Sequence, residues 1–169
     1  LRARIRLRLG LDYKTNNFDL GVRLRSGSDD SQQSPHITIL DFENNDTGDA
    51  HFNLDKWYLK ARDGKLWGLI GRYNLPIWKP NEFFWDDDVT PVGLAGGYRL
   101  NINDNNKLDL KAGYFSLPAG MKNFCGNLGM GQAVFSNSNI TFAAGLYNFE
   151  SGNSTDTHCS IYQQENGQR

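Results

Sequence analysis

Two groups of charged residues carry the chemistry that this sequence offers. Arginines occupy alternate positions at the start of the chain, and three acids follow one another far downstream: Arg2, Arg4, Arg6 and Arg8, then Asp86, Asp87 and Asp88. Spaced guanidinium groups attract anions, whereas clustered carboxylates attract cations or pair with arginines. The two groups therefore predict electrostatic selection of charged solutes.

Patterns for catalysis or metal binding are weak. The three histidines fall in loop-like segments without metal-ligand spacing, and no serine has the context of a catalytic nucleophile. The glycines of residues 93–97 lie inside a strand pattern with no helix after it, so they are not a dinucleotide fingerprint. We expect no enzyme, no metal site and no cofactor.

The arginines belong to a pattern of period two, which is the period of a β-strand. Between residues 1 and 13 every odd position is apolar, while the arginines fill even positions. One face of this strand is therefore aliphatic and the other is cationic. On a soluble sheet the aliphatic face would cover a core, whereas in a membrane barrel it would meet lipid and the arginines would line a wet lumen.

The same alternation continues along the chain and predicts an all-β, antiparallel, up-and-down transmembrane β-barrel. About eight strands are expected in a single partial barrel domain of residues 1–169, approximately at 1–14, 18–26, 53–62, 65–73, 92–102, 107–117, 128–136 and 139–149. Tight turns, such as Asp63-Gly64, alternate with longer polar segments at 26–51 and 74–91. Outer-membrane barrels alternate short periplasmic turns with long outward loops in this way.

Composition is compatible with that fold. A mean hydropathy of −0.59 is too polar for a helical membrane protein, but a spanning strand needs only every second residue to be apolar. The net charge of −1 gives no support for nucleic-acid binding. The chain opens inside a strand pattern and closes on a polar segment, so we expect a fragment of a larger barrel. Aromatic residues stand where interfacial girdles could place some of them: Tyr13, Trp57, Trp67, Tyr98 and Tyr114.

Residues 2–100 contain the segments RARIRLRLGLDY, FDLGVRLRSGSDD, LDKWYLKA, GLIGRYNLPIW and, most specifically, FWDDDVTPVGLAGGY. In these segments the chain resembles the Putative porin family of Gram-negative outer-membrane barrels. The resemblance implies an outer-membrane channel of about sixteen strands, of which this chain would supply about half.

Inward-facing cations would attract anionic solutes in a narrow tunnel of low dielectric constant. The predicted pore-lining residues are Arg2, Arg4, Arg6, Arg8, Arg23, Arg25, Lys56, Lys60, Arg72, Arg99 and Lys111. The alternative is a lining that stays hydrated and pairs with acids, without selectivity. If residues 74–91 fold into the barrel, Asp86, Asp87 and Asp88 would face the arginines across a constriction. These acids could instead form a solvated loop, an anchor that pairs with arginine, or a calcium site.

Cys125 and Cys159 are expected in neighbouring outward loops, where a disulfide is plausible because the periplasm oxidises thiols. Two unpaired cysteines are the alternative. The expected partners are the lipid bilayer of the outer membrane and small hydrophilic solutes, without nucleic acid. Whether copies form a homo-oligomer stays open.

The leading hypothesis is a bacterial outer-membrane porin for passive diffusion of small hydrophilic solutes, including anions. The alternative is a soluble or surface β-barrel module that binds polyanionic ligands, with its apolar faces inside. A third class is an adhesin or assembly scaffold whose loops carry the function. The direction of the aliphatic faces separates the first two.

Overall fold

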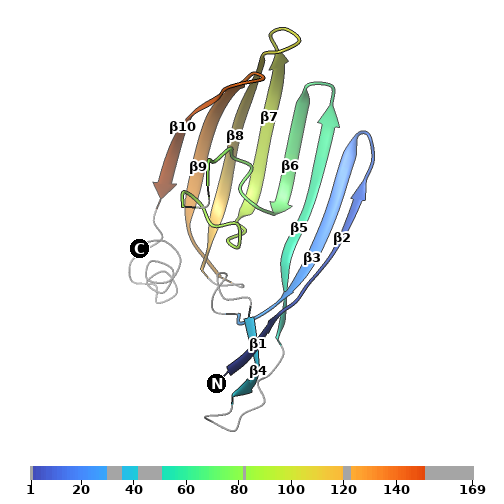
Figure 1. Ribbon diagram of the computed structural model, residues 1–169, viewed down its shortest axis with the longest axis vertical. Coiled ribbons are helices and arrows are strands. Elements are labelled where there is room, and N and C mark those ends of the chain that lie inside the picture. Colours follow the sequence, from blue (N-terminus) through green and yellow to red (C-terminus); the bar gives the residue numbers. More distant parts are fainter. Residues whose placement is uncertain (1, 30–35, 42–50, 82, 120–122, 151–169) are drawn as a thin grey trace.

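The computed structural model describes residues 2–29, 36–41, 51–81, 83–119 and 123–150 (Figure 1). This part of the chain is all-β and contains no helix. The strands are β1 (Arg2–Arg6), β2 (Arg8–Lys14), β3 (Phe18–Ser26), β4 (His36–Asp41), β5 (Phe52–Asp63), β6 (Leu66–Arg72), β7 (Val92–Asn101), β8 (Lys107–Ala119), β9 (Asn123–Ser136) and β10 (Thr141–Glu150). A helix that is long and apolar enough to cross a membrane does not occur among the described residues.

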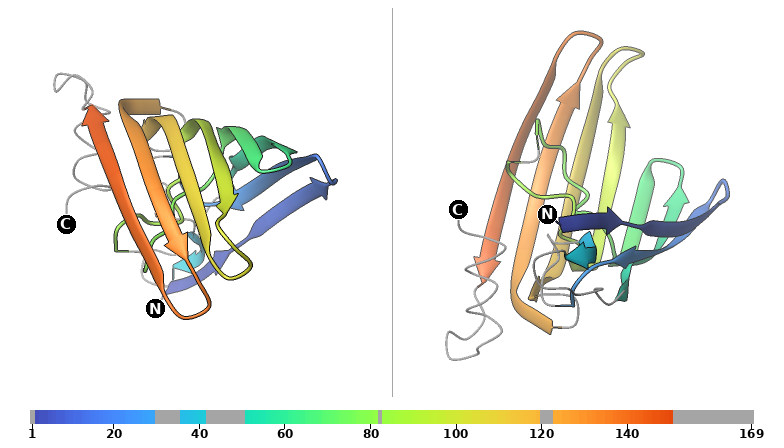
Figure 2. Two further views of the ribbon diagram at one scale, coloured as in Figure 1. Left: turned by 90° about the horizontal axis from the view of Figure 1, so that it is seen from above. Right: turned by 60° about the horizontal axis from the view of Figure 1, so that its bottom comes forward.

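Eight strands form one antiparallel sheet in the order β10-β9-β8-β7-β6-β5-β3-β2. Neighbours along the chain are neighbours in the sheet, apart from the excursion through β4 between β3 and β5. Figure 2 shows that the sheet is strongly curved, so it has a convex and a concave face. The sheet is not closed, since β2 and β10 form its two edges. The fold is therefore an antiparallel meander with the curvature of a barrel wall.

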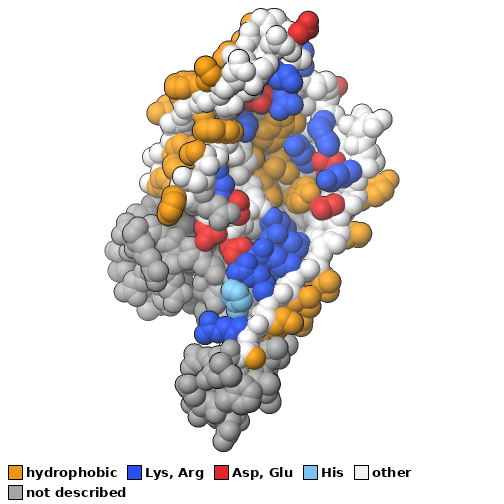
Figure 3. All heavy atoms as spheres, viewed as in Figure 1, with side chains coloured by type: hydrophobic (Ala, Val, Ile, Leu, Met, Phe, Trp, Pro, Cys, Tyr) orange, Lys and Arg blue, Asp and Glu red, His pale blue; other side chains and the backbone are white. Residues whose placement is uncertain are grey.

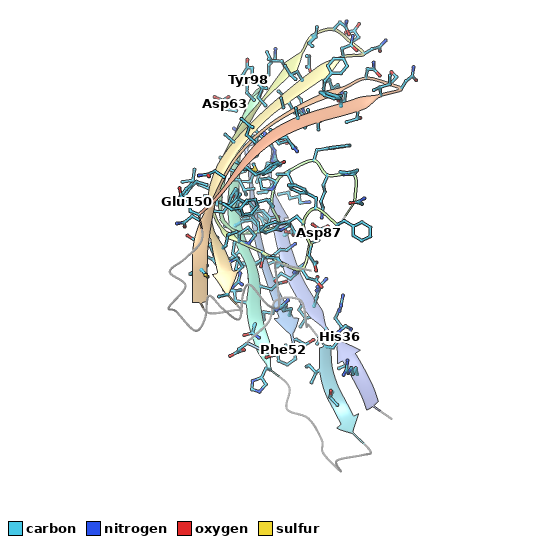
Figure 4. All side chains as sticks on the ribbon, turned by 90° about the vertical axis from the view of Figure 1, so that its left-hand side faces the viewer. His36, Phe52, Asp63, Asp87, Tyr98 and Glu150 are labelled. Atoms are coloured by element: carbon cyan, nitrogen blue, oxygen red, sulfur yellow. The ribbon has the colours of Figure 1, made fainter. Side chains whose placement is uncertain are left out.

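Tight turns join the strands at one end of the sheet. Gly64 has a φ of 56°, which suits the turn after Asp63, and the Asn137 side chain accepts from the Ile140 amide at 2.8 Å. Asp63 and Tyr98 lie near this end in Figure 4, and Phe52 lies near the other. The connection between β8 and β9 is shorter than the predicted loop, because β9 begins at Asn123 and Ala119 pairs with it.

The predicted opening strand is divided at Leu7. Leu7 forms two hydrogen bonds of 2.8 Å with Ser26. The Leu7 amide donates to the serine hydroxyl, and the Leu7 carbonyl accepts from the serine amide. Gly27, with a φ of 122°, then turns β3 away, so β1 has no partner in the main sheet. β1 pairs instead with β4, whose residues the sequence placed in a loop, and this pairing supplies hydrogen-bond partners for its backbone groups.

The two faces of the sheet differ in the way that the alternation predicts. Leu20 and Leu59 are 45% and 44% exposed on the convex face, whereas Asp19 and Asp55 are 8% and 0% exposed on the concave face. Other apolar side chains exposed on the convex face are Leu9, Leu11, Val22, Leu24, Trp57, Ile70, Leu94, Tyr98, Leu110, Tyr114 and Leu146. Trp67 is the exception among the girdle candidates, because its ring packs on the concave side against Gly97 and below the ammonium group of Lys60.

The buried apolar cluster lies on the concave face. Phe115 and Leu128, paired between β8 and β9, are fully buried there. They pack against Tyr73 and Leu75, which belong to the connection between β6 and β7. We call this connection, residues 73–81 and 83–91, the inner loop. Figure 4 shows it on the concave side of the sheet, with Asp87 on it.

Candidate functional site

The concave face carries most of the charged side chains of the sheet. In Figure 3, Lys and Arg side chains gather in a patch on this face beside acidic side chains. The predicted lining residues that lie on the eight-stranded sheet are Arg8, Arg23, Arg25, Lys56, Lys60, Arg72, Arg99 and Lys111. Arg2, Arg4 and Arg6 lie on β1 instead, outside the main sheet. The row of arginines that the sequence predicted on one strand, which we call the basic ladder, is therefore divided between two sheets.

A β-bulge in β5 places two consecutive charged residues on the concave face. The register of β3 with β5 shifts between Arg23 and Leu24, so that Asp55 is left without a partner residue. Asp55 is buried and Lys56 half-buried, while Leu54 and Trp57 on either side are exposed. The sequence carries the signal for this bulge, because the apolar positions change from even, at Leu54, to odd, at Trp57.

Asp55 joins two strands to the end of the inner loop. Its carboxylate accepts from Arg23 Nε at 2.6 Å, and its backbone oxygen accepts from the Thr90 hydroxyl at 3.0 Å. Arg72 Nε donates to the Thr90 backbone oxygen at 3.2 Å. Since an isolated buried carboxylate is unfavourable, the arginine charges are what allow Asp55 to be fully buried.

The acidic run of the inner loop is held by basic and amide side chains. Asp88 forms an ion pair with Arg8 and lies 3.9 Å from Arg6. Asp87 lies 2.9 Å from the Lys79 ammonium group. Asp86 accepts from the Asp88 amide at 2.8 Å, which stabilises the local turn. The contact that the sequence proposed between these acids and the arginines is thus present at Asp88.

Asn74 connects the start of the inner loop to both its end and the sheet. Its side-chain amide donates to the Asp87 backbone oxygen at 2.7 Å. Its side-chain oxygen accepts from the ammonium group of Lys56. Asn74 therefore links Lys56 on β5 to both ends of the inner loop.

The middle of the inner loop is fixed by Gln132 on β9. The Trp78 amide donates to the Gln132 side-chain oxygen at 2.7 Å, and the Gln132 side-chain nitrogen donates to the Trp78 carbonyl at 2.8 Å. The same nitrogen also donates to the Tyr147 hydroxyl at 3.0 Å. Nearby, the rings of Phe84 and Tyr147 have centroids 4.9 Å apart. The inner loop is consequently a packed part of the concave side.

Burial raises the pKa of Tyr73 at the start of the loop, so its phenol stays protonated.

Sequence reasoning missed Asn74, Thr90 and Gln132, because a single uncharged polar residue in a loop or a strand carries no distinctive signal. Asp55 was also missed, although the change of apolar positions in β5 marks it.

The remaining predicted site residues lie elsewhere. Arg99 pairs with Asp109 at 2.6 Å near the tight-turn end. Cys125 is buried within β9 and not in a loop, and no cysteine in the described part is free. Cys159 lies outside the described residues, so its pairing with Cys125 stays a prediction. Within the described ranges, no group of three or more His, Cys, Asp or Glu residues is arranged to hold a metal ion.

Comparison with known proteins identifies the family of this sequence. The family model described as Putative porin matches residues 1–168. No curated protein and no solved structure matches the chain. Because the family match extends over nearly all of the sequence, this chain belongs to the Putative porin family.

Proposed function

We propose that the chain forms part of the wall of a bacterial outer-membrane porin, which allows passive diffusion of small hydrophilic solutes. The concave face would line the pore and the convex face would contact lipid. The observation that carries this proposal is the distribution of side chains, which is the inverse of that in a soluble protein: apolar side chains are exposed on the outside and charged side chains are buried on the inside. Leu20 and Leu59 are about half exposed on the convex face, while Asp55 and Arg25 are fully buried on the concave face.

Lipid is the environment that suits the convex face. Apolar surface in water is unfavourable by roughly 25 cal/mol per Å², and large apolar side chains cover the outside of most strands. A soluble binding module would place these side chains in its core and its arginines on the outer surface. The observed orientation therefore supports the porin over the soluble module, in agreement with a family of channels.

The inner loop supplies a constriction in this proposal. It crosses the concave face and brings Asp88 to Arg8, so negative and positive groups face each other where the pore narrows. Such an arrangement orients dipolar solutes and selects by charge and size. The surrounding cations favour anions: Arg8, Arg23, Arg25, Lys56, Lys60, Arg72 and Lys111.

Conductance of the full-length protein in planar lipid bilayers tests the function. We expect discrete openings with a current proportional to voltage, and a reversal potential in a potassium chloride gradient that indicates preference for chloride. Absence of conductance would contradict the channel and favour the scaffold. Preference for potassium would be consistent with a channel but would contradict the anion selectivity assigned to its basic lining.

A further inference from the structure

We propose that Arg8, Arg23 and Lys56 form a binding site for a multivalent oxyanion of the phosphate type inside the pore. The inference rests on the proposed function, since it names a solute class and a place for it on the lumen wall. The three residues come from the adjacent strands β2, β3 and β5 and face the concave side.

The strand register places like charges directly opposite each other on this face. Arg23 on β3 is paired with Lys56 on β5, and Arg8 on β2 is paired with Arg25 on β3. Like charges in directly opposed positions of a sheet repel and destabilise it unless an anion lies between them. The β3 members of these pairs, Arg23 and Arg25, lie two residues apart on the same face, so negative charge is favoured strongly at this place.

Carboxylates of the protein meet that demand in part. Asp55 pairs with Arg23, and Asp88 pairs with Arg8. Lys56 has no ion pair among the described residues, and its ammonium group donates to the neutral amide oxygen of Asn74. The Lys56 ammonium group is therefore hydrogen-bonded to a neutral dipole, while the carboxylates of Asp55 and Asp87 act on it without forming an ion pair.

One unused hydrogen-bond donor lies in the same place. Arg8 Nε is buried and has no hydrogen-bond partner among the described residues. Arg23, in contrast, directs both Nε and Nη2 to the Asp55 carboxylate. Buried donors of this kind are unfavourable unless an acceptor reaches them.

A phosphate-type oxyanion matches these groups better than chloride does. Guanidinium groups present donors in a planar fork that fits two oxygens of one anion, and the lysine adds a point charge. A divalent anion also compensates more than one of the opposed cations. The Asp88 carboxylate already pairs with Nη2 of Arg8, so it competes with the incoming anion for this guanidinium group.

Inorganic phosphate and the Lys56→Gln variant test the site. We expect millimolar phosphate to reduce the chloride conductance of the full-length protein saturably. Lys56→Gln should weaken this block about tenfold, the usual effect of losing one charged hydrogen bond. Lys56→Arg should retain the block, and Asp88→Asn should strengthen it because Arg8 is released.

Lys111→Gln is the matched control, because Lys111 is also a half-buried lysine on the concave face but lies beside Asp109 and Arg99. It should leave the block unchanged, whereas equal weakening in both glutamine variants would overturn a discrete site.

Calorimetric titration of the protein in detergent with phosphate measures binding without conductance. Heat of phosphate binding that is lost in Lys56→Gln would support the site even if the protein showed no conductance. Conductance that phosphate does not block, together with no heat of binding, would overturn the site.

Discussion

The side-chain amide of Gln132 on β9 hydrogen-bonds both backbone groups of Trp78 in the inner loop, at 2.7 and 2.8 Å. The two residues are 54 positions apart in the sequence. A side-chain amide here takes the place of a neighbouring strand, since it satisfies one backbone donor and one backbone acceptor together. This contact holds the middle of the loop against the wall, while ion pairs hold its end.

Replacement of Gln132 by Leu should loosen the inner loop. The variant keeps a similar volume but loses both bonds to Trp78, each worth about 1 kcal/mol. We expect a wider and noisier open channel, measured as single-channel conductance and current noise in planar bilayers. Gln132→Glu, which retains the acceptor and loses the donor, should be intermediate. A Leu variant with wild-type conductance and noise would contradict the fixing role of this residue.

Replacement of Asp88 by Asn should increase the preference for anions. The change removes one negative charge and releases Arg8 from its ion pair. The reversal potential in a salt gradient should move further toward the chloride equilibrium potential. Asp109→Asn is the matched control, because Asp109 pairs with Arg99 near the tight-turn end, away from the inner loop. Equal shifts in the two variants would argue against a selective role of the loop.

Replacement of Asp55 by Asn should destabilise the fold more than any change at an exposed acid. The carboxylate is fully buried and pairs with Arg23, so its loss leaves an uncompensated cation. The expected loss is about 3 kcal/mol, measured by urea unfolding of the refolded protein in detergent. Asp12→Asn serves as control, since Asp12 lies on the exposed β2 edge and accepts from the Tyr58 hydroxyl. A similar small loss in both would show that Asp55 is not the central ion-pair partner.

Adjacent cysteine substitutions should report which face is wet. Leu59 is exposed on the convex face, and Lys60 points to the concave face. In lipid vesicles, Lys60→Cys should react with a charged, membrane-impermeant thiol reagent, whereas Leu59→Cys should be protected. The unsubstituted protein controls for reaction at Cys125 and Cys159. The reverse pattern would favour the soluble module with its apolar faces inside.

The amino-acid sequence by itself determined the eight strands of the main sheet and their two faces. The alternation of apolar and polar residues is a local property, so it predicted that Leu20 and Leu59 share one side and Asp19 the other. Local turn chemistry, as at Asp63-Gly64, likewise predicted where strands reverse. Even the bulge at Asp55 left a local sign in the change of apolar positions.

Only the tertiary structure decided where the inner loop lies and how the basic ladder is divided. Arg8 and Asp88 are 80 residues apart, and nothing near either residue specifies the other. The division at Leu7 likewise depends on Gly27 ending the partner strand, which leaves β1 to pair with β4. Such contacts form because a buried charge or backbone group must find a partner, and the fold alone determines which partners are within reach.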